Sequence, residues 1–148
     1  MKRFHIHLSV DDLGKNIEFY SQLFNIEPTV SKDDYAKWML DDPALNFAIS
    51  TRGTKTGLDH VGIQTDTDAE LACLRSHLET TSIKGIAQDD ATCCYAKADK
   101  YWVQDPQGIA WEAFHSLESV PVFGEDHAVA TDSACCAPGL SQTSSSCC

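Results

Sequence analysis

The sequence has no long apolar run and few basic residues. None of its apolar stretches approaches the roughly 20 residues that a membrane-spanning helix needs. Lysine and arginine together number 11 against 22 acidic residues, so the formal net charge is −11. Such an acidic surface repels nucleic acid and anionic membranes. We therefore expect neither as a partner of this chain.

The first ten residues also lack the features of a secretory signal. They read MKRFHIHLSV and alternate apolar residues with histidine, so they contain no continuous apolar stretch and no small-residue cleavage site. We therefore expect a cytoplasmic protein. In that compartment thiols stay reduced, and clustered cysteines bind metals more often than they form disulfides.

The composition predicts one folded domain and a tail. A chain of 148 residues that is 43% hydrophobic can fill one core. We place the domain at residues 1–120 and a flexible, cysteine-containing tail at residues 121–148. The tail is rich in serine and alanine, has no lysine or arginine, and shows no apolar periodicity.

Within the domain, the pattern of apolar residues occurs twice. Alternation over residues 3–10 predicts a strand, residues 10–24 have the spacing of an amphipathic helix, and further strands follow. A shift of 55 residues lays His5 on His60 and Asp11 on Asp66. The two repeats, at about 3–52 and 57–116, each predict a strand, a helix and three strands, which is an α+β fold.

This repeat predicts a metal site. It brings the equivalent His5 and His60 together near a pseudo-twofold axis, with Glu112 in the last strand, where a carboxylate is costly unless paired or metal-bound. Two imidazoles and one carboxylate leave coordination positions open and suit non-haem Fe(II), although Zn(II), Ni(II) and Mn(II) also accept them. We expect His7, whose counterpart in the second repeat is Gly62, to line the pocket.

The cysteines are arranged unusually. Six of the seven form adjacent pairs, namely Cys93–Cys94, Cys135–Cys136 and Cys147–Cys148. Neighbouring cysteines bond poorly to each other, but two nearby thiolates chelate a soft centre such as trivalent arsenic, Cd(II) or Hg(II). We expect Cys93 and Cys94 in a mobile loop, over residues 88–99, at the mouth of the metal cleft.

Three segments resemble one protein superfamily. Residues 4–28 (FHIHLSVDDLGKNIEFYSQLFNIEP), 58–66 (LDHVGIQTD) and 105–114 (DPQGIAWEAF) are similar to the glyoxalase, bleomycin-resistance and extradiol-dioxygenase superfamily of vicinal-oxygen-chelate proteins. The resemblance implies two βαβββ repeats in a half-barrel or barrel, with metal ligands His5, His60 and Glu112. Enzymes like glyoxalase I carry a further Glu, which would fall at or next to Ala48, so that activity is disfavoured.

Within this superfamily, the ligand set and the cysteine pair resemble the organoarsenical carbon–arsenic lyases, which are grouped with a cadmium-induced protein family. The resemblance implies a catalytic centre in which His5, His60 and Glu112 hold Fe(II). It also implies that Cys93 and Cys94 bind a trivalent organoarsenical such as methylarsonous acid, which dioxygen helps to cleave to arsenite. Such a protein confers organoarsenical resistance.

Two alternatives stay open. A non-catalytic thiol protein that binds Cd(II) or arsenite would need the cysteines alone, and a ring-cleaving dioxygenase would need the metal ligands alone. The resemblance does not decide whether the site lies within one chain or is shared in a homodimer. It also does not name the preferred organic group on arsenic.

The tail cysteines generate the first prediction. A flexible tether raises the local concentration of bound cargo near the cleft, so the tail pairs should collect arsenical without taking part in bond cleavage. Deleting residues 130–148 should leave turnover at saturating arsenical nearly unchanged and slow it when arsenical is scarce. Steady-state rates over a substrate series measure this. Complete loss of activity at saturation would instead place the tail in the active site.

Overall fold

The computed structural model describes residues 2–121 together with Ala137 and Pro138. The elements run in the order β1 (Arg3–Ser9), α1 (Leu13–Phe24), β2 (Val30–Ser31), β3 (Tyr35–Asp41), β4 (Ala44–Ser50), β5 (Gly57–Thr65), α2 (Asp68–Glu79), β6 (Ile86–Cys93), β7 (Ala96–Gln104) and β8 (Ala110–Ser119). In the described part of the chain, neither helix is long and apolar enough to cross a membrane.

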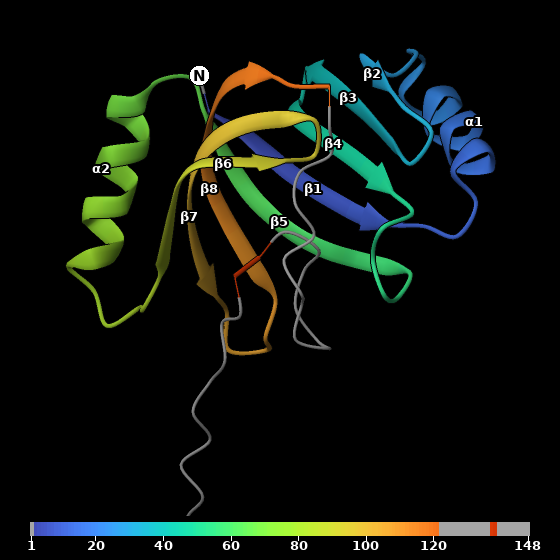
Figure 1. Cartoon of the computed structure of the whole chain (residues 1–148). Coiled ribbons are helices and arrows are strands. Elements are labelled where there is room, and N and C mark those ends of the chain that lie inside the picture. The colour runs from blue at the N-terminus through green and yellow to red at the C-terminus, as the bar shows by residue number, and fades with distance from the viewer. Residues whose placement is uncertain (1, 122–136, 139–148) are drawn as a thin grey trace, which may run out of the picture.

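The strands form one sheet that confirms the predicted repeat. Its order is β2-β3-β4-β1-β5-β8-β7-β6, so the first strands of the two βαβββ modules meet at the centre. There β1 pairs antiparallel with β5, while β4 and β8 pair parallel with β1 and β5 respectively. The sheet curls into a half-barrel, with α1 and α2 at opposite sides of the molecule (Figure 1).

Both helices begin at residues suited to that position. The Asp12 side chain caps α1 by accepting a hydrogen bond from the Lys15 backbone N–H, within the range predicted for a helix at residues 10–24. The Thr67 side chain caps α2 in the same way, through the backbone N–H of Glu70. These caps fix where the chain turns from the central strand of each module onto its helix.

Alternation along β1 separates an apolar outer face from a polar inner face. Ile6 and Leu8 pack with the buried Trp38 against the cluster that α1 covers. His5 and His7 point the other way and are both buried. The outer face therefore supplies hydrophobic stabilisation, and the inner face carries the side chains of the site.

The predicted loop around the cysteine pair is instead a β-hairpin. Strand β6 ends at Cys93 and β7 begins at Ala96, so only Cys94 and Tyr95 form the turn. Their φ angles are 57° and 59°. Two positive φ values are typical of the type I′ turn, which normally takes Asn-Gly, so Cys-Tyr does not predict a hairpin there. The predicted mobility of residues 88–99 stays a prediction.

The tail has one contact that the sequence did not indicate. Ala137 is buried and packs against Trp102 and Ala110 on the inner side of the second module. Part of the segment predicted as a flexible tail, at Ala137, therefore packs on the domain. Cys135–Cys136, Cys147–Cys148 and most of the predicted tail lie outside the described residues.

Gly62 permits the close approach of β5 and β8. A Cβ atom at this position would lie 2.2 Å from the Glu112 carbonyl oxygen. We predict that Gly62→Ala lowers the free energy of unfolding by about 1–3 kcal/mol, because backbone must move to relieve the overlap. Thermal or denaturant unfolding measures the change.

Gly14→Ala in α1 is the matched control. Its nearest neighbour would be the Asp12 Oδ1 atom at 3.6 Å, an ordinary contact. The free energy of unfolding should rise here by up to about 1 kcal/mol, because alanine is the better helix former. Equal stability of both variants would contradict the close-approach argument.

Candidate metal and thiol site

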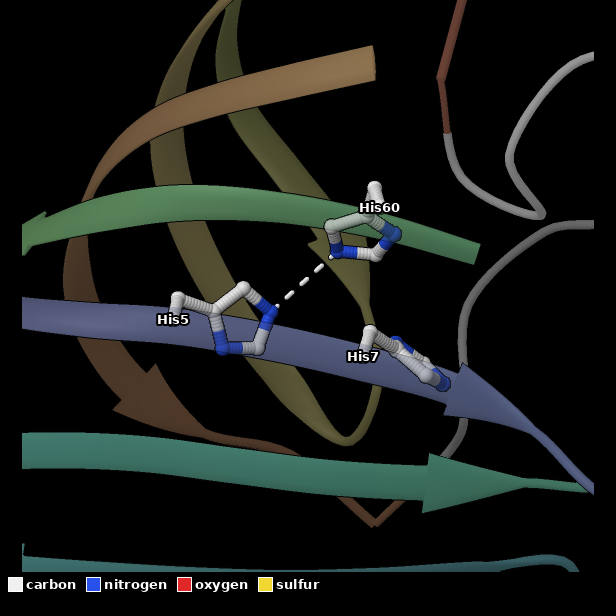
Figure 2. A group of neighbouring side chains, drawn as sticks. All are labelled: His5, His7 and His60. Atoms are coloured by element: carbon white, nitrogen blue, oxygen red, sulfur yellow. Dashed lines mark hydrogen bonds between the residues drawn. The ribbon is translucent and has the colours of Figure 1, made fainter. Parts of the chain in front are cut away.

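Three strands bring the candidate metal ligands together. The Nε2 atoms of His5 (β1) and His60 (β5) are 3.2 Å apart, and the Oε2 atom of Glu112 (β8) lies 3.8 Å and 3.6 Å from them respectively. Bonds of about 2.1 Å to one octahedral cation would separate adjacent ligand atoms by about 3 Å. Figure 2 shows the two rings facing each other from neighbouring strands. The three side chains therefore fit one divalent ion.

Hydrogen bonds on the far side of each ring aim the Nε2 atoms at that point. His5 Nδ1 donates to the Asn46 carbonyl oxygen at 3.0 Å, and His60 Nδ1 donates to Asp59 Oδ1 at 2.6 Å. Metal-binding histidines are commonly held by such a carbonyl or carboxylate, which fixes the ring and raises its basicity. Both rings are thus oriented for ligation by their surroundings.

His7 offers a second arrangement. Its ring nitrogens lie close to those of His5 and His60, with one candidate ligand atom from each of the three within 4.8 Å of the others. However, His7 Nε2 is already hydrogen-bonded to Ser50 Oγ at 2.9 Å, and its Nδ1 faces the Cys94 thiol at 4.0 Å. We therefore favour the set with Glu112. The expectation that His7 lines the pocket is confirmed.

Lys100 is the residue that sequence reasoning missed. It is only 7% exposed, and its Nζ lies 2.6 Å from Glu112 Oε1. The sequence held one indication, because a carboxylate in a buried strand needs a partner and Lys100 opens the predicted strand beside it. The buried carboxylate thus faces an ammonium through one oxygen and the histidines through the other.

These contacts shift the pKa values of the three candidate ligands. Burial, assisted by the positive charge of His60, lowers the pKa of His5 to about 3. Burial also acts to lower the pKa of His60, but hydrogen bonds to Asp59 and Glu112 outweigh it and raise the value to about 9. For Glu112, burial is outweighed by Lys100 and the histidines, so its pKa falls below the usual range. At neutral pH, His60 therefore carries the proton that a cation must displace.

The cysteine pair opens into the same cavity. Cys93 is buried and Cys94 half-buried, with 3.0 Å between their sulfur atoms. They line one cavity with the two metal-facing histidines and Glu112. The expectation of a reduced pair fails at Cys93, which is disulfide-bonded, whereas Cys94 keeps its thiol. Two-thiol chelation here requires prior reduction of Cys93.

A hydrogen bond and a ring contact hold the hairpin turn against the first module. The Tyr95 hydroxyl donates to the Asp34 carboxylate, which also pairs with Arg52. The Tyr95 ring lies 5.7 Å from that of Tyr35, which belongs to the cluster around Cys93. Contacts from both modules therefore hold the cysteines beside the candidate ligands. Within one chain, the described residues supply every group predicted for the site.

Known proteins agree with this fold. Residues 2–113 match the model of the Glyoxalase/Bleomycin resistance protein/Dioxygenase superfamily. A trivalent organoarsenical cleaving enzyme of Bacillus sp. strain MD1 is 37% identical over 162 residues, covering 100% of this chain and 99% of the relative. The cadmium-induced protein CadI of Mycobacterium bovis is 34% identical over 125 residues, covering 84% and 82% respectively.

This decides the family. The chain belongs to the glyoxalase, bleomycin-resistance and dioxygenase superfamily. The Mn(II)-bound glyoxalase of Novosphingobium aromaticivorans has the same fold, with a TM-score of 0.57 at 15% identity over 81% of this chain and 42% of that structure. Members of the superfamily bind divalent metals, and the histidine cluster of this chain fits such a site.

The strand register tests whether Ala48 lies where enzymes like glyoxalase I carry a further Glu. Gly62 lies opposite Glu112, and the equivalent pair in the first module is His7 and Ala48. Ala48 is therefore the position equivalent to Glu112, as the repeat predicted. It supplies no fourth ligand of the kind expected for glyoxalase I.

The raised pKa of His60 generates a prediction for metal binding. Below about pH 9, the metal-free protein holds a proton on His60, which a cation must displace. Affinity for Zn(II) or Mn(II) should therefore rise about tenfold per pH unit from 6 to 8, with about one proton released. His5 and Glu112 add no dependence in this range, because their pKa values are lowered.

Calorimetry in buffers of different ionisation enthalpy measures the released proton. Asp59→Asn is the matched variant, because it removes the carboxylate that holds the His60 proton. Its affinity should depend less on pH over the same range. An affinity of the parent protein that does not change between pH 6 and 8 would show that His60 is not a ligand.

Proposed function

We propose that this protein is a cytoplasmic Fe(II)- and dioxygen-dependent carbon–arsenic lyase that degrades trivalent organoarsenicals, such as methylarsonous acid, to arsenite and so confers organoarsenical resistance. The observation that carries the proposal is the meeting of two kinds of site in one cavity. Adjacent thiols suited to a soft centre and a His-His-carboxylate set suited to Fe(II) line the same walls. The similarity to organoarsenical cleaving enzymes along the whole chain supports this substrate class.

The cysteines bind and orient the substrate in this proposal. Once Cys93 is reduced, two sulfur atoms 3.0 Å apart can hold one arsenic atom together. Each new As–S bond replaces an As–OH bond and releases water. Because Cys94 sits at the turn that Tyr95 fastens to Asp34, the bound arsenical faces the histidines and its organic group remains in the cavity.

His5, His60 and Glu112 hold the metal, and Fe(II) bound there would supply activation of dioxygen beside the arsenical. Asp59 receives the His60 Nδ1 proton and keeps that ring fixed. Lys100 balances the charge of Glu112 and so keeps the carboxylate ionised in a buried place. Ala48, which lies at the position equivalent to Glu112, offers no ligand atom, so the first module adds no second carboxylate to the site.

Replacing the two sets of residues separately tests this proposal. Glu112→Gln should abolish release of arsenite from methylarsonous acid, because the metal loses its anionic ligand, but should leave arsenical binding by the reduced cysteines within about twofold. Cys94→Ser should weaken binding of phenylarsine oxide at least tenfold and abolish cleavage at low substrate. Arsenic speciation after anaerobic Fe(II) loading and admission of air measures cleavage, and titration with phenylarsine oxide measures binding.

The other two functions give different results. If the protein is a thiol trap for Cd(II) or arsenite, the parent will retain the arsenical and release no arsenite with Fe(II) and air. If it is a ring-cleaving dioxygenase, it will open a catechol ring, and Cys94→Ser will not change that rate. Either result would overturn the lyase proposal.

A further inference from the structure

Lys37 has an unusual position for a lysine. It lies on β3 between Ala36 and Trp38, both of which face the apolar cluster beneath α1. Because side chains alternate along a strand, Lys37 faces the opposite way, into the half-barrel. It lines the same cavity as Cys94 and Glu112. The first module thus supplies a half-buried ammonium group to the thiol end of the site.

Other cavity and hairpin lysines have carboxylate partners. Lys100 pairs with Glu112, and Lys97 beyond the turn pairs with Asp90. Among the described residues, no carboxylate forms an ion pair with Lys37, although the chain has 22 acidic residues against 11 basic ones. Burial lowers the pKa of Lys37, and the negative charge of Cys94 opposes that shift. Among the described groups, Cys94 is therefore the one whose negative charge, when the thiol is ionised, stabilises this ammonium.

The surroundings of Cys94 contain few other net charges. The remaining titratable groups of the cavity are His5 and His7 from β1, Tyr35 from β3, His60 from β5, Cys93 from β6, Lys100 from β7 and Glu112 from β8. Lys100 and Glu112 compensate each other. Asp34, behind Tyr95, is compensated by Arg52. His60, which is protonated at neutral pH, is compensated by Asp59. Among the groups that line the cavity, Lys37 remains as the cation without a carboxylate partner among the described residues.

We propose that Lys37 is a positioning residue that holds Cys94 as a thiolate, and that Cys94 is consequently the first of the two thiols to bond to a thiophilic centre. The order of bonding rests on the proposed function, whereas the effect of Lys37 on the Cys94 thiol does not. The thiolate is the nucleophilic and metal-binding form of cysteine, and a neighbouring lysine favours it. His7 Nδ1 contacts the same sulfur at 4.0 Å.

The binding sequence that follows is balanced. The Cys94 thiolate bonds to arsenic in R–As(OH)₂, and one As–O bond breaks to release hydroxide. That hydroxide takes the proton of the reduced Cys93 thiol and becomes water. The Cys93 thiolate then displaces the second hydroxyl group as hydroxide. One thiolate and one thiol have then replaced two hydroxyl groups, with no change in the oxidation state of arsenic.

Alkylation of reduced protein tests the role of Lys37 without any arsenical. The rate at which iodoacetamide modifies Cys94 is followed against pH by peptide mass spectrometry, which separates Cys94 from the other cysteines. Lys37→Met keeps the length and apolar stem of the side chain and removes its charge. At pH 7 it should slow Cys94 modification at least fivefold and move the pH midpoint upward, while Lys37→Arg should restore most of the rate.

Lys97→Met is the matched control, because Lys97 lies on the same hairpin and pairs with Asp90 away from the thiols. It should leave the Cys94 midpoint unchanged. Thermal unfolding and Zn(II) affinity should be similar in all these variants, which separates a charge effect from misfolding. An unchanged midpoint in Lys37→Met would overturn the proposal.

A separate rate measurement tests whether Cys94 is the first thiol to bond to arsenic. The second-order rate constant for phenylarsine oxide should fall in Lys37→Met by the same factor as alkylation. If alkylation slows but the arsenical rate does not, Lys37 acts on the thiol and Cys94 is not the first point of attachment. If Lys37→Met slows both reactions and yet the parent never releases arsenite, this inference stands and the lyase proposal fails.

Discussion

The antiparallel pairing of β1 with β5 is the constraint on which the rest of the site depends. It joins the two modules through their first strands, and its register brings the Nε2 atoms of His5 and His60 to 3.2 Å. Two buried imidazoles at this distance repel each other if both are protonated, so the cavity tolerates one proton at most. The lowered pKa of His5 follows from burial and from this exclusion, and the raised pKa of His60 follows from its hydrogen bonds to Asp59 and Glu112.

Charge compensation then explains how so polar a cavity exists inside an acidic protein. Glu112 is 3% exposed, yet it stays ionised because Lys100 lies against one oxygen and the histidines against the other. A divalent cation would take the place of the His60 proton, so its net addition to the cavity is one charge. The site can therefore change from the protonated to the metal-bound form with little change in its other contacts.

The sequence predicted those parts of the site that depend on repetition and alternation. The 55-residue shift made His60 the equivalent of His5, and the later strands of the repeat placed Ala48 at the position of Glu112, because both modules fold alike. The sequence did not identify Lys100 or Lys37 as residues of the cavity. A lysine in a strand usually reaches solvent, and only tertiary packing turns these two inward. The hairpin at Cys94 was also missed, because nothing in Cys-Tyr favours two positive φ values.

Differences between the two repeats make the two sides of the cavity chemically different. In a symmetric scaffold, Glu112 would have a carboxylate counterpart at Ala48, and His7 would have a histidine counterpart at Gly62. Instead the carboxylate occurs in one module and the extra histidine in the other, so the metal side and the thiol side of the cavity differ chemically. Gly62 allows β8 to carry Glu112 close, and Ala48 leaves room beneath Cys93. A molecule held by the thiols therefore meets the open side of the metal position, which a four-ligand site would close.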